Sequence, residues 1–596
     1  MMLKWLQVTA LSFGLMLAGL YGNTEYEGDW GLENILQVSD GSYYLAASLT
    51  NEIYRFSRDN ELIARTTLPA LPMGMTLSQD SGSLIVTGGV GTGYIHILES
   101  KSLKTKKSFK AGHSPQAPCF SPDGFQLAIS QRFKNEVWIY DARTWQISAK
   151  HPVLREPVDL HWRHDSELVV LHHLSDRSAN ADWTGVSIAK LNTRNGRITE
   201  IPLEDGSSGA RKLALTPDKR YALSAMTIGS HRVPATQIER GWIIKNGLSV
   251  IDLDNAKMLG TLLLDDLYRG AANPWDIQIS DTKAWVSLSG THQIIEIDYP
   301  ALIQTLESFS EQEREQMGYD LRLGYAWKRR FDLKGLGPRA LSFDPQSNSL
   351  LIASYFNNAV ERFSSSESEI SLELPPKALR ASRQGEFHFH NAMHSFQNWM
   401  SCASCHPDAR TDALNWDLEN DGVGTPRQAK SLLLAHQTPP TTVTGIRPNA
   451  ETSVRAGIKF LRSAMPESDA QAIDFYLSSL SQTPSPYLID GNLSPSAEQG
   501  KRLFRGKAGC AECHNGNNYT NKALEWVGTG IDDESELKFD VPTLREVWRS
   551  APYLHDGRAT SIHESMTRFN PEHMHGETDQ LSSEELDQLI EYVHTL

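Results

Sequence analysis

A turn built around aspartate recurs through the first 360 residues, and two short runs rich in β-branched and aromatic residues follow each copy. Successive turns lie 40, 43, 42, 53, 63 and 63 residues apart, at Asp40, Asp80, Asp123, Asp165, Asp218, Asp281 and Asp344. A unit of about 40 residues with several short strands is typical of one blade of a β-propeller. We therefore predict an all-β, seven-bladed propeller over residues 28–363, rather than a pair of β-sandwiches.

Two of the repeating units are longer than the others, with additional residues around 228–245 and 304–327. Polar and aromatic side chains occur in both, namely His231, Arg232, Gln237, Trp242, Arg314, Tyr319 and Arg322. Insertions in a repeat array map to loops on one face, which is often the binding face. We expect these loops to reach the C-terminal part or to cover its substrate; the alternative is solvated loops without function.

The repeat ends at Arg362, where the composition changes. Ser, Glu and Pro dominate residues 364–380, which predicts a linker. Each half of the remaining chain contains a Cys-x-x-Cys-His motif and ends in an amphipathic helix with a capping signal, at Ser468 and Ser582. We predict two mainly α, cytochrome c-type domains, at residues 381–484 and 485–596.

The two motifs predict covalent attachment of two c-type haems, because paired thiols bind the haem vinyl groups and the adjacent His binds iron. Haem 1 is assigned to Cys402, Cys405 and His406, and haem 2 to Cys510, Cys513 and His514. The alternative, a zinc or redox Cys-x-x-Cys site, does not explain why His follows immediately both times. Residues 1–22 read as a signal peptide, and c-type haem attachment takes place outside the cytoplasmic membrane, so we expect a periplasmic protein.

The formal net charge is −15, which argues against a nucleic-acid partner, and we expect no membrane span beyond the signal segment. Haem attachment uses four of the five cysteines. The remaining one, Cys119, therefore has no partner for a disulfide and is expected to be a small buried residue.

The C-terminal part resembles the bacterial dihaem cytochrome c peroxidases, a family that includes the MauG-type enzymes. The resemblance covers residues 380–596 and rests on the segments Ser401–His406, Gly424–Arg427, Gly500–Phe504, Val541–Arg545 and Ala551–Gly557. It implies that haem 1 reacts with hydrogen peroxide while a six-coordinate haem 2 passes electrons. It also implies a calcium ion between the haem domains, for which no acidic loop is evident here.

This sequence departs from the family pattern at both distal positions. The segment 417–421 has no His to cap haem 1, so haem 1 would rest with an open face. His436 is the nearest replacement as distal ligand or acid–base group, unless it is a structural His. For haem 2 the expected ligand position is Phe569, and the substitutes are Met566, Met574 and His575. We favour His575, because the adjacent glycine lets the backbone approach closely.

The family's tryptophan between the haems is also missing, since the matching segment is 444–447, Thr-Gly-Ile-Arg. Trp416 or Trp399 are alternative electron relays, although either is also compatible with simple packing. Glu451 is a candidate distal acid, and the alternative is an exposed helix residue.

These observations predict a periplasmic dihaem c-type peroxidase or MauG-like oxidase. Its electrons would come from a small redox protein or from an oxidisable side chain of a protein substrate. Two alternatives stay open. One is an electron-transfer protein that uses the propeller as a docking module. The other is a propeller with its own small-molecule active site, from which the haems remove electrons.

Overall fold

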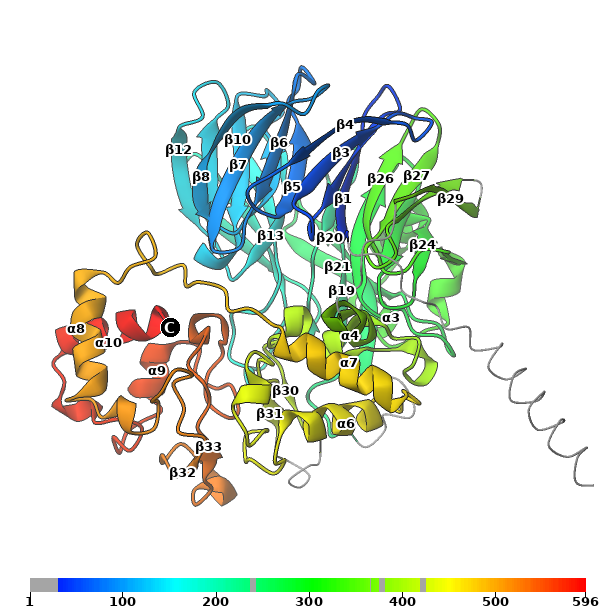
Figure 1. Ribbon diagram of the computed structural model, residues 1–596. Coiled ribbons are helices and arrows are strands. Elements are labelled where there is room, and N and C mark those ends of the chain that lie inside the picture. The colour runs from blue at the N-terminus through cyan, green and yellow to red at the C-terminus, as the bar shows by residue number, and fades with distance from the viewer. Residues whose placement is uncertain (1–29, 236–242, 365, 375–380, 419–424) are drawn as a thin grey trace, which may run out of the picture.

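The computed structural model describes residues 30–235, 243–364, 366–374, 381–418 and 425–596. The predicted signal peptide, Gln237, Trp242 and residues 365 and 375–380 of the predicted linker lie outside these ranges. Seven antiparallel sheets surround a common axis, and two helical units lie together on one side of the ring (Figure 1). The prediction of a seven-bladed propeller followed by a helical region is confirmed.

The first four blades each contain four strands, in chain order. Blade 1 consists of β1 (Leu32–Gln37), β2 (Tyr43–Ala47), β3 (Glu52–Phe56) and β4 (Leu62–Thr67). Blade 2 consists of β5 (Pro72–Leu77), β6 (Ser83–Gly88), β7 (Thr92–Glu99) and β8 (Thr105–His113). Blade 3 consists of β9 (Pro115–Phe120), β10 (Gln126–Gln131), β11 (Glu136–Asp141) and β12 (Ile147–Pro152). Blade 4 consists of β13 (Pro157–His164), β14 (Glu167–His172), β15 (Ser187–Asn192) and β16 (Ile198–Pro202).

The last three blades complete the ring. Blade 5 has a divided inner strand and consists of β17 (Ser207–Ser208), β18 (Leu213–Leu215), β19 (Tyr221–Gly229), β20 (Ile244–Asp252) and β21 (Lys257–Leu263). Blade 6 consists of β22 (Pro274–Ile279), β23 (Ala284–Leu288), β24 (Gln293–Ile297) and β25 (Lys328–Asp332). Blade 7 consists of β26 (Pro338–Asp344), β27 (Ser349–Ser354), β28 (Ala359–Ser364) and β29 (Glu367–Glu373).

The recurring aspartate turns connect the inner strand of each blade to the next strand. In five of them the aspartate carboxylate accepts a hydrogen bond from the backbone N–H two residues later, at 2.8–3.0 Å. These are the turns at Asp40, Asp80, Asp123, Asp218 and Asp344. An aspartate that binds its own backbone in this way favours a tight turn. The local chemistry of this one residue therefore explains the regular period of the sequence.

No strand is exchanged between the first and last blades, since β1–β4 and β26–β29 are each continuous in sequence. Side chains close the ring instead: Asn358 accepts a hydrogen bond from Trp30 N at 3.1 Å, and Asn60 donates one to Ser371 O at 2.9 Å. The structure differs from the expected linker, because Glu367–Glu373 forms the outer strand of blade 7. Outer strands face solvent, so its Ser- and Glu-rich sequence has a linker-like composition.

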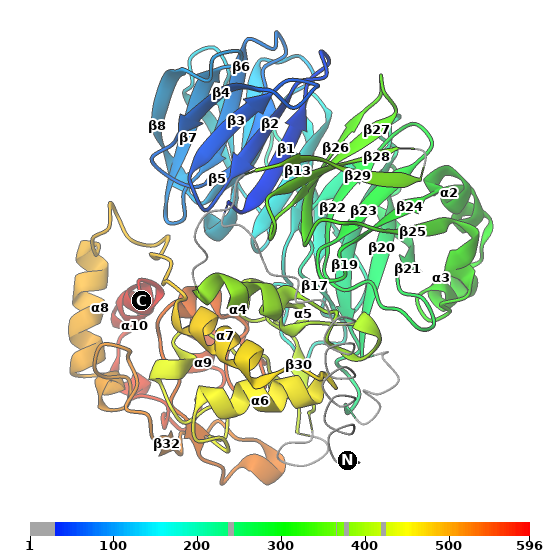
Figure 2. The ribbon, with the colours of Figure 1, turned by 45° about the vertical axis from the view of Figure 1, so that its right-hand side comes forward.

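The two insertions behave differently. In the first, Ala235 donates a backbone hydrogen bond to Asp417 O at 2.9 Å, so this loop reaches the helical part as expected. The second forms α2 (Tyr299–Ser308), α3 (Glu311–Met317) and η3 (Leu323–Ala326). Leu302 and Leu306 of α2 pack into the core of blades 5 and 6, and the helices lie at the outer edge of the ring (Figure 2). The expectation that this insertion reaches the helical part is wrong.

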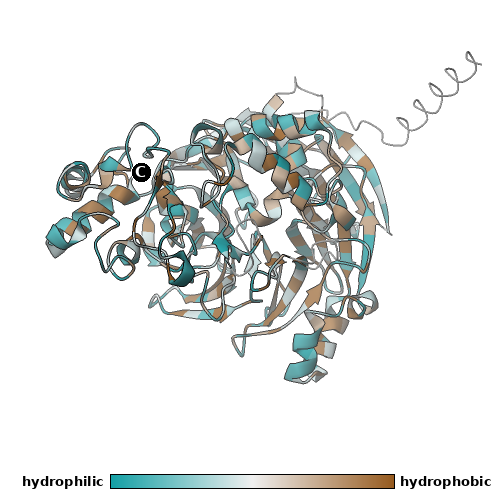
Figure 3. Ribbon diagram, turned by 90° about the horizontal axis from the view of Figure 1, so that it is seen from below, coloured by the Kyte–Doolittle hydropathy of each residue, from teal (hydrophilic) through white to brown (hydrophobic). Residues whose placement is uncertain are grey.

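The N-terminal helical unit contains α4 (Ala381–His390), η4 (Phe396–Asn398), α5 (Cys402–Cys405), η5 (Pro407–Ala409), β30 (Asn415–Trp416), β31 (Arg427–Gln428), η6 (Ala435–Gln437), α6 (Ala450–Phe460) and α7 (Glu467–Ser478). The C-terminal helical unit contains α8 (Pro495–Arg505), η7 (Cys510–Glu512), β32 (Leu524–Glu525), η8 (Asp532–Glu534), β33 (Phe539–Asp540), η9 (Val547–Arg549), α9 (Ile562–Met566), η10 (Thr578–Gln580) and α10 (Ser583–His594). Hydrophobic and hydrophilic stretches alternate along these helices, as expected for helices packed on one side (Figure 3). None of the helices in the described ranges is long and apolar enough to cross a membrane.

Candidate functional site

Each helical unit is held together by a crossing of its first and last helices at a glycine. A Cβ atom on Gly385 of α4 would lie 1.8 Å from Ala472 O of α7, and one on Gly500 of α8 would lie 1.9 Å from Gln588 O of α10. Four residues after each glycine, a Phe ring packs against a Tyr ring at 5.4 Å between centroids, in the pairs Phe389–Tyr476 and Phe504–Tyr592. Only glycine allows so close an approach of two helices.

Between the motif and the last helix, residues 434–447 and 546–559 of the two units share a backbone course at an offset of 112 residues. Leu434 and Glu546 both have positive φ, 62° and 57°, and each precedes a short 3-10 helix. Isolated bridges follow at Thr441–Arg447 and Tyr553–Ala559. The resemblance between the halves that the sequence indicates therefore extends to individual backbone positions.

The histidine of each Cys-x-x-Cys-His motif is oriented by a backbone carbonyl. His406 Nδ1 lies 3.2 Å from Arg410 O, and His514 Nδ1 lies 3.1 Å from Tyr519 O. An Nδ1–H that donates to a carbonyl leaves Nε2 available as a metal ligand. Burial lowers the pKa of both side chains, that of His514 to about 4, which keeps the imidazoles neutral. We refer to Cys402–His406 as the first motif and to Cys510–His514 as the second motif.

His575 faces the proximal histidine of the second motif. The ring centroids of His514 and His575 lie 6.4 Å apart. An imidazole nitrogen lies about 2 Å from the first-row metal that it binds and about 1 Å from its ring centre, so rings on opposite faces of one iron are about 6 Å apart. His575 is half-buried and its Nδ1 atom is buried without a hydrogen-bond partner, whereas the side chain of Met574 is 45% exposed. Of the predicted alternatives, the geometry favours His575.

The surroundings of the second motif fit a c-type haem. Cys510 and Cys513 are free thiols, so both can form thioether bonds. Apolar side chains from α8, α9 and α10 pack around Cys510, including Phe504, Ile562 and Leu589. An apolar shell of this kind controls solvent access to a metal centre and so its redox potential.

The first motif is enclosed by the propeller. Asn273, in the loop before β22, donates a hydrogen bond to Ser401 Oγ at 2.9 Å and accepts one from Ser404 Oγ at 3.0 Å. These two serines form the capping box of α5, the helix that carries Cys402 and Cys405. The propeller therefore fixes the conformation of the first motif directly, through contacts that link residues more than 120 positions apart in sequence.

Trp416 lies beside the first motif, in an apolar cluster that includes Cys405 and the propeller residues Ile243 and Ile244. Its Nε1 donates a hydrogen bond to Asp412 Oδ2 at 2.8 Å. Burial raises the pKa of Asp412 to about 7. Asp412 was not predicted as an acid–base group, because an Asp in an irregular segment carries no motif and its burial becomes evident only in the folded protein.

His436 and Glu451 lie in different environments. His436 Nε2 is 3.1 Å from Asp474 Oδ1 of α7, and its Nδ1 is buried without a hydrogen-bond partner. Asp474 orients the imidazole, which leaves Nδ1 free to accept a proton. Glu451 is an exposed residue in the first turn of α6, so the structure does not bring it to the other candidate residues.

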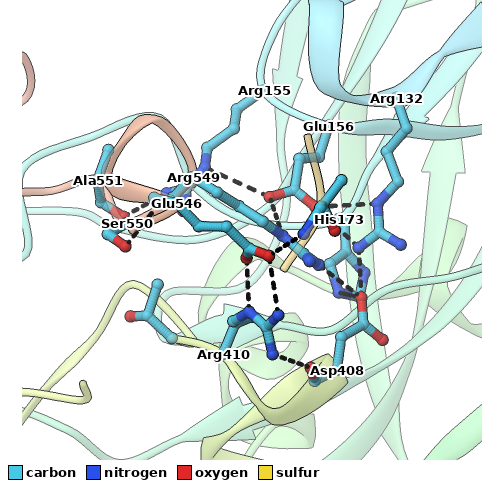
Figure 4. Close-up of polar contacts among 12 residues, drawn as sticks. Arg132, Arg155, Glu156, His173, Asp408, Arg410, Glu546, Arg549, Ser550 and Ala551 are labelled. Atoms are coloured by element: carbon cyan, nitrogen blue, oxygen red, sulfur yellow. Dashed lines mark hydrogen bonds and ion pairs between the residues drawn. The ribbon is translucent and has the colours of Figure 1, made fainter. Parts of the chain in front are cut away.

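Charged side chains from the propeller and from both helical units meet at Asp408, two residues after the first motif (Figure 4). Asp408 contacts Arg132 and Arg211 of the propeller, at 2.6 and 2.9 Å, and Arg549 of the C-terminal unit at 2.9 Å. Nearby, Glu546 binds Arg410 through both carboxylate oxygens, at 2.7 and 3.0 Å. Burial alone would raise the pKa of Asp408, but the surrounding cations hold it well below its usual range.

A sequence model of the family Cytochrome c matches residues 497–596, the C-terminal unit. The chain is 28% identical to hydrazine synthase subunit gamma of Kuenenia stuttgartiensis over 271 residues, which cover 36% of this chain and 77% of that subunit. The protein described here is a haem c redox protein related to hydrazine synthase subunits. The identity to subunit beta of the same organism is 24% over 177 residues, or 29% of this chain and 46% of that subunit. The chain contains at least one c-type haem.

The similarity to MauG is weak and partial. The methylamine utilization protein MauG of Methylorubrum extorquens is 29% identical over 83 residues, which cover 12% of this chain and 24% of that protein. Among solved structures, Kuenenia stuttgartiensis hydrazine synthase superposes with a TM-score of 0.53 at 18% identity, over 58% of this chain and 99% of that one. This likeness concerns the fold. The chain spans about half of subunit beta and a quarter of MauG.

Proposed function

We propose that the protein is a periplasmic oxidoreductase with two c-type haems, one bound at each motif, in two cytochrome c-type domains. The first motif would hold the reacting haem and the second an electron-transfer haem. The observation that carries this assignment is the difference between the two proximal histidines. His514 faces His575 at 6.4 Å, whereas His406 has no comparable histidine ring opposite it among the described residues.

When bound, a haem iron with one protein ligand has a face available for a small oxidant such as hydrogen peroxide, while an iron with two histidines transfers electrons only. The residues around the first motif suit a reaction that moves protons. Asp412 holds a proton near neutral pH. Elsewhere in the N-terminal unit, His436 has an unpartnered Nδ1 and is oriented by Asp474. The side chains of Ile243 and Ile244 exclude water from the propeller side of the same region.

Electrons would enter or leave through the second motif. Met574, next to the proposed ligand His575, is 45% exposed, and Trp526 is 40% exposed. Exposed apolar side chains beside an electron-transfer centre suit a small redox protein or an oxidisable protein substrate, and we expect contact here. The calcium ion implied by the family resemblance stays a prediction.

Hydrazine, as a product that an assay can run in reverse, is the second candidate small reactant. This chain covers 77% of the length of hydrazine synthase subunit gamma. The same reactive site would then exchange electrons with a nitrogen compound instead of a peroxide. Assays that supply hydrogen peroxide with a reduced dye, and hydrazine with an oxidised dye, distinguish the two substrates.

The assignment is tested by electron paramagnetic resonance of the resting ferric protein. We expect one low-spin and one high-spin haem, and conversion of the low-spin signal to high spin in the variant His575→Ala. The exposed His563→Ala variant serves as a control and should leave both signals unchanged. Two low-spin haems in the unmodified protein, inert towards peroxide and hydrazine, would instead identify an electron carrier.

A further inference from the structure

Two histidines and an aspartate converge where α4 and α7 run side by side in the N-terminal unit. His388 belongs to α4, His394 to the segment after it, and Asp469 to the first turn of α7. One ligand-type atom from each residue lies within 4.8 Å of the other two. Among the residues that the structure describes, no other three side chains of this kind are arranged in the same way.

His388 is the least satisfied member of this group. Its side chain is 9% exposed, and neither ring nitrogen has a hydrogen-bond partner. Its Nε2 lies 3.7 Å from Asp469 Oδ1, which is too long for a hydrogen bond. A buried polar group without a partner destabilises the folded state. A cation held between His388, His394 and Asp469 would remove that destabilisation.

The C-terminal unit provides an internal comparison. Counting from the two glycine crossings, the position of His388 corresponds to Leu503, and that of Asp469 to Glu585. Leu503 packs with the apolar core, and Glu585 forms an ion pair with Lys507 at 2.7 Å. In the C-terminal unit, the corresponding helix pair therefore has an apolar residue and a separate ion pair at these positions. In the other unit, it carries an unpartnered imidazole beside a carboxylate.

We infer that His388, His394 and Asp469 form a binding site for a divalent transition metal, with zinc as the best match. Imidazole nitrogens favour such metals over calcium and magnesium, and two His with one carboxylate and a water is a known zinc ligand set. Ligands at about 2.0–2.1 Å from a tetrahedral metal lie about 3.4 Å apart, so the 4.8 Å group must contract modestly. Burial lowers the pKa of His388, which keeps the imidazole neutral as a ligand requires.

The bound metal would connect the C-terminal end of α4 to the N-terminal end of α7. These helices form the crossing at Gly385, and the segment that contains His394 continues to Cys402. A metal at this position would therefore stabilise the helix pair and the start of the first motif together. A metal that binds only the folded state raises the melting temperature as the metal concentration increases.

The test is metal analysis of the full-length holoprotein, purified without a histidine tag, treated with a chelator and then dialysed against zinc. We expect about one zinc per chain, counted against haem iron, and a melting temperature that rises with added zinc. In His388→Ala and Asp469→Asn, bound zinc should fall at least tenfold. His164→Ala, which removes an exposed propeller histidine, should bind as much zinc as the unmodified protein.

Zinc content that is equal in the unmodified protein and both ligand variants would overturn the assignment, as would an unmodified protein that binds none. The haem absorbance of each variant establishes that the holoprotein has folded before zinc is measured. If His388→Ala fails that check, His394→Ala replaces it, because His394 is only partly buried and outside the helix. Neither substitution touches His406 or His514, so the haem signals of the proposed function provide an independent readout.

Discussion

Asp412 carries a buried carboxyl group beside the first motif, and its environment explains its properties. Burial raises the pKa to about 7, and hydrogen bonds from Leu414 N and Trp416 Nε1 counteract only part of this shift. A carboxyl group with a raised pKa is protonated in the native protein at a pH at which it is ionised in the unfolded chain. This difference links the protonation of one residue to the stability of the fold.

We predict that Asp412 lowers the stability of the protein as the pH rises from about 4 to about 7. In this window the native state binds more protons than the unfolded state, so the free energy of unfolding falls, by on the order of 4 kcal/mol in total. The variant Asp412→Asn cannot titrate and should lose less thermal stability between pH 5 and pH 7.5, measured as the melting temperature of the holoprotein. Asp59→Asn, at an exposed site, is the control and should follow the unmodified protein.

The helix crossings at Gly385 and Gly500 are the elements that shape the two helical units. In both, the glycine allows the backbone of the last helix to approach without a side chain between them. The sequence contains the pattern Gly-x-x-x-Phe at both sites, but glycine within a helix is otherwise a poor helix former. Its presence at equivalent places indicates a packing requirement rather than a local preference.

We predict that Gly385→Ala and Gly500→Ala each destabilise the holoprotein, by about 1–3 kcal/mol or more, because the new methyl group meets a backbone oxygen. Gly457→Ala is the matched control. This residue lies in α6 with no atom within 4 Å of the added Cβ, so the change should be neutral or stabilising by up to about 1 kcal/mol. Thermal melting of the three variants checks the ranking, and equal melting temperatures would contradict it.

The sequence allowed the blades to be predicted because most of the Asp turns are local structures, stabilised by a hydrogen bond between residues two positions apart. His406 and His514 could be selected as candidate ligands because each directly follows its cysteine pair in the sequence. The contacts of Asn273 with Ser401 and Ser404 span about 130 residues, and no local pattern signals them. Strand β29 was missed because its polar composition is common to linkers and outer strands.

At the scale of the whole molecule, the charged cluster around Asp408 and Glu546 joins the propeller to both helical units. Arg410 and Glu546 are almost fully buried, with side chains 8% and 1% exposed. Glu546 also accepts a hydrogen bond from Thr483 N in the segment that connects the two units. Glu546 corresponds in position to Leu434 of the N-terminal unit. The carboxylate is therefore a feature of the contact between the propeller and the helical units, and not of the backbone course that the two units share.

We predict that Glu546→Ala destabilises the protein by about 3–5 kcal/mol, because Arg410 would be left buried without its partner. The melting temperature and the rate of proteolysis between the helical units both report this loss. Arg143→Ala removes a partner from an ion pair whose arginine side chain is 73% exposed, and it should change stability by less than about 1 kcal/mol. A similar effect of both substitutions would argue against a structural role for the junction.

The contact between Asn273 and the first motif also has a consequence for biogenesis. Ser404, between the two cysteines, is 3% exposed under the propeller, whereas its counterpart in the second motif, Glu512, is exposed. Any factor that joins haem to Cys402 and Cys405 needs access to this stretch. If haem is attached at the first motif, as proposed, the final docking of the propeller would come after that attachment, although the propeller precedes the helical units in the chain. Haem attachment at the second motif would not depend on propeller docking.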